Sequence, residues 1–136
     1  MQTLDGAGRV VRTVDAAGYV VGREYDGTGQ LQHVVEYALQ AGTPSAQDRH
    51  TRYTYDGAGR LVGKTDALGG QQYHTYDALG NRIAFTNEVG AAWTYAYDLA
   101  GRLIREVSPP VADGPSGIVT LTGYDLFGNL VSRTEA

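Results

Sequence analysis

Residues 55–61 read Tyr-Asp-Gly-Ala-Gly-Arg-Leu, and residues 97–103 read Tyr-Asp-Leu-Ala-Gly-Arg-Leu. The dipeptide Tyr-Asp occurs five times, and its aspartates at positions 56, 77 and 98 are spaced by 21 residues. Asp5 follows a leucine instead of a tyrosine and stands 21 residues before Asp26. A fixed period of this kind indicates an array of similar supersecondary units, each of which buries its apolar side chains only against its neighbours.

A second turn signal divides each period in two. Tetrads of the form Asp-x-x-Gly recur along the chain, and the tetrad at position 87 has Asn in place of Asp. The spacing between consecutive tetrads alternates between 10 and 11 residues, except at two longer gaps. The first side chain of such a tetrad accepts hydrogen bonds from backbone N–H groups two residues on, and the glycine tolerates the left-handed conformation that closes a bulged hairpin. We assign these turn and repeat roles to Asp5, Gly8, Asp15, Gly18, Tyr25, Asp26, Gly29, Tyr55, Asp56, Gly59, Asp66, Gly69, Tyr76, Asp77, Gly80, Asn87, Gly90, Tyr97, Asp98, Gly101, Tyr124, Asp125 and Gly128.

The segments between the turns have the alternation typical of strands. Within 92–97, Trp93, Tyr95 and Tyr97 fall on one face and small or polar residues on the other. Within 31–37, the side chains aligned on one face are Leu31, His33, Val35 and Tyr37. No segment shows a sustained helical period, so almost no helix is expected. The predicted fold class is all-β: an antiparallel meander of hairpin repeats, two strands per 21-residue repeat, forming a curved or spiralling sheet.

Two insertions interrupt the period within what we expect to be a single array over residues 1–136. The loops are predicted near 40–48 and 108–118, and all four prolines lie in them, so no proline is expected inside a strand. Both insertions replace a turn that is not preceded by Tyr-Asp. Because alternate turns of a meander lie at opposite ends of the strands, both loops are expected on the same rim.

Composition excludes several classes of protein. The 136 residues carry a formal net charge of -4 and no cysteine, which argues against a nucleic-acid surface, disulfides and thiolate metal sites. No apolar run is long enough to span a bilayer, and no charged and then apolar leader follows Met1, so this segment is expected to contain no secretory signal peptide.

Candidate catalytic residues are few. Eight of the fifteen acidic residues are turn aspartates at fixed spacing, each without a partner that would make it a general acid or base. One carboxylate per tetrad also falls short of the six to eight oxygens that calcium requires. His33, His50 and His74 lack metal-ligand spacing. We therefore expect no enzyme activity, no catalytic or metal site and no cofactor.

The motif itself resembles the YD repeat of the RHS family. Residues 55–61 and 97–103 carry its Tyr-Asp-x-x-Gly-Arg-Leu form, and residues 76–82 and 124–130 carry a Gly-Asn variant. The resemblance implies strand-turn-strand units from a long sheet that spirals into a hollow shell. Such shells enclose a toxic C-terminal segment in bacterial RHS toxins and in similar toxin-complex components, and teneurins use a similar shell for adhesion outside animal cells.

The chain departs from a complete member of that family. It has about six units, which are too few to close a large shell. It lacks the Asp-Pro-x-Gly-Leu motif of the family's self-cleaving protease region, and it has no toxin-like segment before Ala136. We therefore expect a fragment of the repeat region. Its partners would be flanking repeats of the same protein and an enclosed toxin segment, in a parent protein that is secreted or at the cell surface.

An alternative function is a carbohydrate-binding or adhesion module that uses the Tyr- and Trp-bearing β surface to stack on a glycan. Exposed tyrosines with polar neighbours would favour glycan binding, whereas tyrosines packed under adjacent strands would favour a wall. Open strand edges also predict self-association of the excised array.

Overall fold

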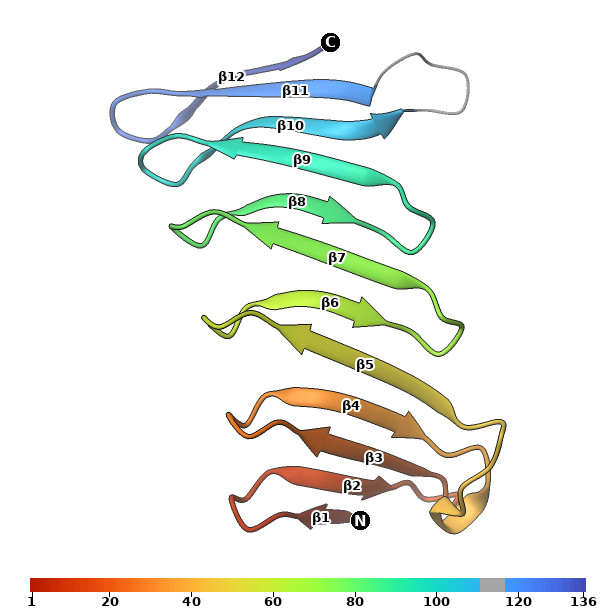
Figure 1. The fold of residues 1–136 in the computed structure, drawn as a ribbon. Helices are drawn as coiled ribbons and strands as arrows, with labels where there is room; N and C mark the ends of the chain where they lie inside the picture. Colours follow the sequence, from red (N-terminus) through yellow and green to blue (C-terminus); the bar gives the residue numbers. More distant parts are fainter. Residues whose placement is uncertain (111–116) are drawn as a thin grey trace. The chain divides into compact units, whose positions relative to one another are not determined.

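The computed structural model describes residues 1–110 and 117–136, which fold into twelve β-strands that follow one another in sequence order (Figure 1). The chain divides into two compact units, Met1–Gln71 and Gln72–Ala136. Apart from one three-residue 3₁₀ turn, the described residues contain no helix. The predicted all-β antiparallel meander with almost no helix is confirmed.

In the first unit, every strand pairs with the next in antiparallel register. Its elements are β1 (Gln2–Leu4), β2 (Val10–Val14), β3 (Val20–Tyr25), β4 (Leu31–Glu36), the 3₁₀ turn η1 (Gln40–Gly42), β5 (Arg49–Tyr55) and β6 (Leu61–Thr65). The predicted alternation of β4 is confirmed, since His33 and Val35 are buried, Val34 between them is half-buried, and Gln32 and Glu36 on either side are exposed.

The second unit repeats the same antiparallel pairing. Its strands are β7 (Gln71–Tyr76), β8 (Arg82–Thr86), β9 (Ala92–Tyr97), β10 (Leu103–Pro110), β11 (Gly117–Tyr124) and β12 (Leu130–Glu135). Here the aromatic face of β9 packs against β8: the Phe85 and Trp93 ring centroids are 5.4 Å apart, and Phe85 also stacks on His74 at 5.1 Å.

Each Tyr-Asp hairpin contains a bulge at its tyrosine. In the β3–β4 pair, for example, Glu24 faces His33 but Tyr25 faces Leu31, so one residue of β4 is skipped. The glycine that ends each turn has a positive φ, between 75° at Gly101 and 91° at Gly80. A type I turn followed by a left-handed glycine is the usual way to join strands with such a bulge.

The strands form a single layer within each unit, so few side chains are fully buried. Among the described residues, the buried hydrophobic side chains are Val20 and Val35, with exposed fractions of 1% and 8%. Val20 is covered by the first insertion, in which Gly42 lies so close that a Cβ placed on it would be 3.3 Å from the Val20 Cβ. The insertion is held there by Ala41 N, which donates to Gly18 O at 3.0 Å, and by Arg12, whose Nη2 donates to Ala41 O at 2.9 Å.

Two of the four prolines do not lie where the sequence-based prediction placed them. β10 extends to Pro110, so Pro109 and Pro110 lie inside a strand, and the expectation that prolines avoid strands was wrong at this point. The register between β10 and β11 is irregular between Val107 and Pro110, which allows a residue without an N–H at the end of the strand. The loop predicted near 108–118 lies partly in 111–116, outside the described residues.

Candidate functional site

The Tyr-Asp turns and the Leu4-Asp5 turn share one pattern of local hydrogen bonds. In the turn that starts at Asp5, the carboxylate Oδ1 accepts from the backbone N–H groups of Ala7 and Arg9, both at 2.9 Å. The backbone closes the same loop, because Gly8 N donates to Asp5 O at 3.0 Å and Asp5 N donates to Arg9 O at 2.9 Å. The turns that start at Asp26, Asp56, Asp77, Asp98 and Asp125 repeat this arrangement.

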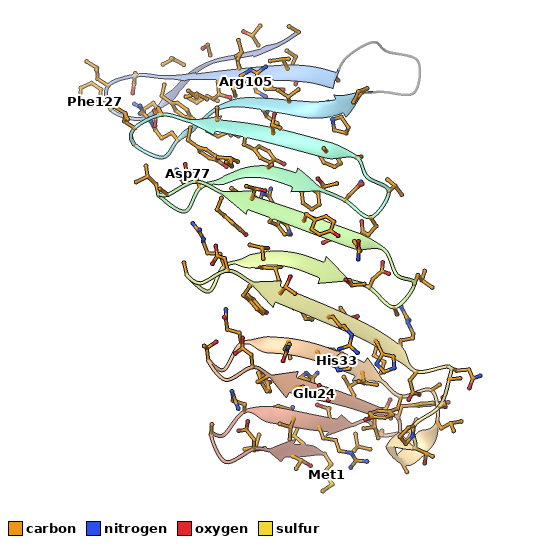
Figure 2. The ribbon with its side chains drawn as sticks, in the orientation of Figure 1. Met1, Glu24, His33, Asp77, Arg105 and Phe127 are labelled. Atoms are coloured by element: carbon orange, nitrogen blue, oxygen red, sulfur yellow. The ribbon has the colours of Figure 1, made fainter. Side chains whose placement is uncertain are left out.

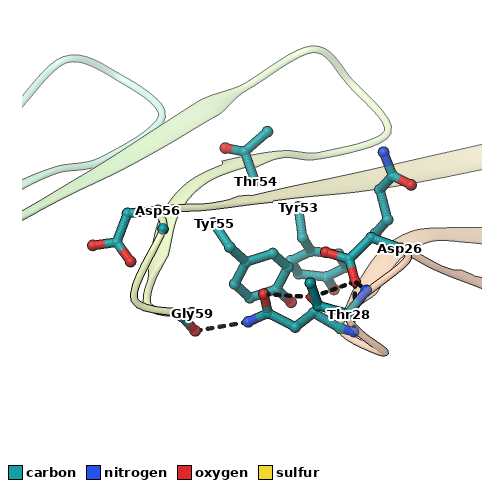
Figure 3. Close-up of a pocket in the computed structure, with 10 residues that line it drawn as sticks. Asp26, Thr28, Tyr53, Thr54, Tyr55, Asp56 and Gly59 are labelled. Carbon is teal, nitrogen blue, oxygen red and sulfur yellow. Dashed lines mark hydrogen bonds between the residues drawn. The ribbon is translucent and has the colours of Figure 1, made fainter.

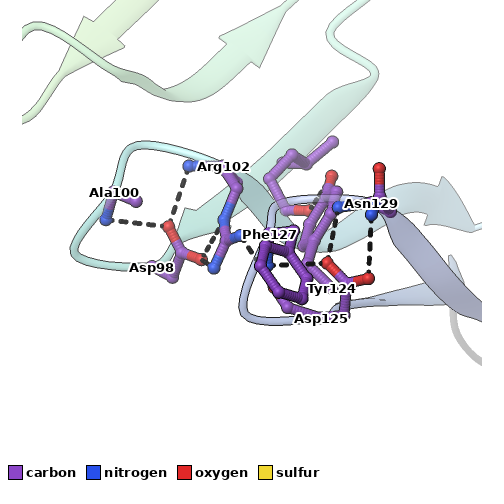
Figure 4. Close-up of polar contacts among 8 residues, drawn as sticks. Asp98, Ala100, Arg102, Tyr124, Asp125, Phe127 and Asn129 are labelled. Atoms are coloured by element: carbon purple, nitrogen blue, oxygen red, sulfur yellow. Dashed lines mark hydrogen bonds and ion pairs between the residues drawn. The ribbon is translucent and has the colours of Figure 1, made fainter.

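The residue after the turn glycine binds the second carboxylate oxygen. Arg9, Arg60 and Arg102 each donate Nε–H to Oδ2 of their own aspartate at 2.7 Å. In the Gly-Asn variant the side chains of Asn81 and Asn129 do the same at 2.9 Å. The carboxylates are therefore engaged as structural acceptors, as Figure 4 shows for Asp98 and Asp125.

These contacts lower the pKa of the turn carboxyl groups. For Asp5, Asp56 and Asp98 the largest cause is the hydrogen bond from the backbone of the residue after the glycine, and burial opposes it. For Asp77 and Asp125 the largest cause is the asparagine side chain. A carboxylate that accepts several N–H bonds is held in its charged form, which suits a turn acceptor and not a general acid.

Four of the five repeat tyrosines link their hairpin to the hairpin before it. Each hydroxyl donates to the first residue of an earlier strand: Tyr25 to Val10 O at 2.9 Å, Tyr55 to Leu31 O at 2.8 Å and Tyr124 to Leu103 O at 3.1 Å. Tyr97 likewise donates to Arg82 O at 3.0 Å. Burial raises the pKa of the Tyr55 and Tyr97 hydroxyls.

The turn arginine covers the ring of the next repeat tyrosine. The Arg9 Cζ lies 4.6 Å from the centroid of Tyr25, and the Arg102 Cζ lies 4.8 Å from that of Tyr124 (Figure 4). A guanidinium over an aromatic face is attracted by the ring quadrupole. One arginine thus binds its own aspartate and the next tyrosine, and we call this set of three residues a rung.

The rung at Asp26 is different, because Gln30 stands where the other turns have Arg or Asn. Gln30 Nε2 donates to Gly59 O at 2.7 Å, and its Oε1 lies 3.3 Å from the oxygen of the Thr28 hydroxyl. Beside it is a cavity of about 580 Å³, lined by Asp26, Thr28, Gln30, Gln32, Tyr53, Thr54, Tyr55, Asp56, Gly57 and Gly59 (Figure 3).

The turns without a preceding Tyr-Asp have the same backbone geometry. Asp15, Asp66 and Asn87 each accept two backbone hydrogen bonds through Oδ1, at 2.8–3.2 Å. Gly18, Gly69 and Gly90 have φ values of 88°, 85° and 80°. Asn87 shows that an amide oxygen supports this turn as well as a carboxylate.

The histidines are arranged in a way that sequence reasoning missed. His33 Nδ1 lies 3.1 Å from Glu24 Oε2, and its Nε2 lies 3.1 Å from His50 Nδ1, with the two rings stacked at 5.2 Å. Figure 2 shows Glu24 and His33 on neighbouring strands. The register of β4 with β5 brings His33 and His50 together, because Val35 faces His50 and His33 faces Arg52. That register depends on the insertion between the strands, so the spacing of the histidines did not reveal it.

The described part of the chain contains no cluster of side chains arranged to bind a metal ion. Within residues 1–110 and 117–136, no group of three or more His, Cys, Asp or Glu side chains is placed to hold a metal ion. In the same residues, no helix has the length and apolar character needed to cross a bilayer.

The tyrosines bear on the glycan alternative. The five repeat tyrosines are half-buried, and the hydroxyls of Tyr25, Tyr55, Tyr97 and Tyr124 are bound to backbone carbonyls. Tyr19 and Tyr73 are the more exposed, at 48% and 51%. The repeat tyrosines therefore pack against neighbouring strands, and four of their hydroxyls are held by the backbone.

The second unit also presents large apolar side chains at the tips of its Tyr-Asp turns. Leu79, Leu99, Leu126 and Phe127 are 77–102% exposed. Phe127 projects from the tip of the β11–β12 hairpin (Figure 2). The corresponding tip positions of the first unit carry small or polar residues such as Ala7, Thr28 and Ala58.

The fold and the rungs together define an antiparallel β-hairpin repeat protein with a Tyr-Asp or Leu-Asp turn in each repeat. The sequence pattern of the family described as RHS Repeat matches residues 5–38, 45–71 and 76–109. The chain belongs to the RHS repeat family, as the resemblance of its motif implied. No curated protein matches the chain.

The solved structures that are similar to the chain include two at 20% identity. One is the Photorhabdus luminescens Tc holotoxin pore with a mutated TccC3, which covers 100% of this chain with a TM-score of 0.55. The other is the complex TcdB2-TccC3-Cdc42, which covers 94% with a TM-score of 0.48. This chain spans only 9% and 8% of the matched chains, respectively.

Proposed function

We propose that this chain is a non-catalytic wall segment of a β-shell that encloses a toxin segment, within a larger parent protein that is secreted or displayed at the cell surface. Membership of the RHS repeat family supports a structural repeat role. The similarity of fold to a chain of a Tc holotoxin supports a shell that belongs to a toxin.

The observation that carries the proposal is the single layer of strands. A globular domain normally buries the face of a sheet against a second layer, and among the described residues only Val20, Val35 and His33 have buried side chains. Most face residues of β5 to β11 are half-buried by lateral neighbours alone. A wall whose inner face is completed by an enclosed chain would have this exposure.

The chemistry of the rim supports a role without catalysis. The turn carboxylates act as acceptors of backbone and side-chain N–H groups, and their lowered pKa keeps them charged. They repeat with the turns instead of converging on one point. Repeated carboxylates of this kind set the geometry of hairpins.

The last strand supports flanking repeats as partners. β12 pairs with β11 on one side, and all six of its residues are exposed. An unpaired edge of this length is a template for a further strand. In the parent protein, the next repeat would pair with β12 and continue the wall.

Limited proteolysis of the parent protein tests the enclosure. The segment that the shell encloses should resist a protease in the wild type and become cleavable in Gly101→Val, because the substitution distorts a wall turn. Ala100→Val is the matched control and should leave protection intact. If the segment were cleaved equally fast in the wild type and in Gly101→Val, the shell proposal would fail.

A further inference from the structure

The incomplete rung at Gln30 leaves two groups without the partner that they have elsewhere. In a complete rung, arginine binds Oδ2 of its aspartate, covers the next tyrosine and reaches the next turn; Arg102 Nη1, for example, lies 3.4 Å from Asp125 O. Gln30 keeps only the last of these contacts, through Gly59 O. Gln30 therefore places no cation against Asp26 Oδ2 or over the ring of Tyr55.

The carboxylate of Asp26 has an acceptor to spare. Its Oδ1 binds Thr28 N, Thr28 Oγ1 and Gln30 N at 2.7–2.9 Å, and no described residue donates to Oδ2. In each of the other five Tyr-Asp or Leu-Asp turns, an Arg or Asn side chain occupies this oxygen. The Thr28 hydroxyl is the largest cause of a lowered pKa at Asp26, so the carboxylate is charged near neutral pH.

The cavity joins these two positions. Asp26 and Tyr55 both line it, and Tyr53 adds a second ring on the same side, as Figure 3 shows. The second carboxylate of the lining, Asp56, is already bound by Arg60 Nε at 2.7 Å. The charge available to a ligand is therefore the negative charge of Asp26.

The geometry points to a guanidinium-binding pocket, which takes the arginine side chain of another polypeptide. The complete rungs of Arg9 and Arg102 indicate which group would bind here. In each of them a guanidinium lies between an aspartate Oδ2 and a tyrosine ring whose centroid is 4.6–4.8 Å away. A planar guanidinium can donate to a carboxylate and stack on a ring at once, whereas the ammonium of lysine is a compact charge that does not stack. This inference is independent of the proposed shell.

Titration with N-acetyl-arginine amide tests the pocket on the full chain. The NMR signals of the Thr28 and Gln30 amides should shift saturably, with a dissociation constant in the millimolar range for a single side chain. N-acetyl-citrulline amide has the same shape without the charge and should bind at least tenfold more weakly. Equal binding of the two compounds would overturn the proposal.

Two variants locate the site. Gln30→Arg should fill the cavity with the chain's own guanidinium and weaken binding more than tenfold. Asp26→Asn should weaken it similarly while keeping the turn, since Asn87 forms the same turn. Asn81→Arg adds the same charge to a turn of the second unit and should leave binding unchanged. Wild-type affinity in Gln30→Arg, or a loss in Asn81→Arg as large as that in Gln30→Arg, would contradict the assignment.

Discussion

The two units have the same hairpins and rungs but differ in what covers their strands. In the first unit, the insertion around η1 lies against β3 and leaves Val20 only 1% exposed. In the second unit, no side chain among the described residues is buried to that extent, and the rings of His74, Phe85 and Trp93 pack side by side. Lateral neighbours in a single layer thus half-bury a side chain, and full burial requires a segment that crosses the face of the sheet.

The difference also separates two sources of stability. Hairpin turns are local and common to both units, so their contribution should be similar in each. The burial of Val20 is specific to the first unit and should depend on the insertion. Substitutions at matched positions can measure the two sources separately.

The largest effect is expected for Gly42→Val, compared with Gly90→Val. Both glycines have a positive φ, 73° and 80°, that a β-branched residue resists. Only at Gly42 does a Cβ also meet Val20 at 3.3 Å, whereas Gly90 has nothing within 4 Å. We expect a loss of about 3 kcal/mol or more for Gly42→Val and about 1–2 kcal/mol for Gly90→Val. Urea unfolding would measure both, and equal losses would show that the insertion does not cover β3.

Truncation of Val20 should have the next largest effect. Val20→Ala removes buried apolar surface and leaves a cavity, so the free energy of unfolding should fall by about 2 kcal/mol. Val107 in β10 is only half-buried, and Val107→Ala should cost less than about 1 kcal/mol. If Val107→Ala lowered the free energy of unfolding as much as Val20→Ala, the two units would not differ in how well their side chains are covered.

The turn glycines should affect the two units equally. Gly59→Val and Gly101→Val place a β-branched residue at φ values of 82° and 75°, which should cost about 1–2 kcal/mol each. Ala58→Val and Ala100→Val are controls at exposed turn positions and should change stability by less than about 0.5 kcal/mol. Thermal unfolding followed by circular dichroism would test this, and indistinguishable glycine and alanine variants would contradict the turn assignment.

The smallest effect is expected for the pH dependence that His74 adds to the second unit. Burial is the main cause that lowers the pKa of His74 below 6.5, Arg82 adds to it, and the His74 Nδ1 is buried without a partner. The unfolded chain therefore binds a proton first, and stability should decline as the pH falls from 7.5 through 6.5, levelling off below the folded pKa.

His74→Phe should flatten this part of the profile, because phenylalanine keeps the stack on Phe85 without a titrating group. Urea unfolding of the wild type and the variant at pH 7.5 and 5.5 gives the difference. A profile that is as steep in His74→Phe as in the wild type would show that the pH dependence comes from groups other than His74.

The sequence predicted the parts of the fold that depend on local chemistry. An aspartate and a glycine three residues later were enough to predict each turn, because the hydrogen bonds join residues two to four positions apart. Alternation also placed His33 and Val35 on the same face, because the side of a strand on which a residue lies depends only on its position along that strand. The two prolines at the end of β10 were misplaced because an irregular register, which depends on the partner strand, decides where that strand ends.

By itself, then, the amino-acid sequence determined the hairpins, their period and the strand faces, since each follows from interactions within a few residues. Only the tertiary structure decided which side chain is covered, which arginine stacks on which tyrosine and where Gln30 leaves a cavity. Those contacts join residues from about 15 to 30 positions apart, such as Arg9 with Tyr25 and Gln30 with Gly59. Their geometry is set by strand register and loop packing, because a contact at that range requires the intervening chain to be folded first.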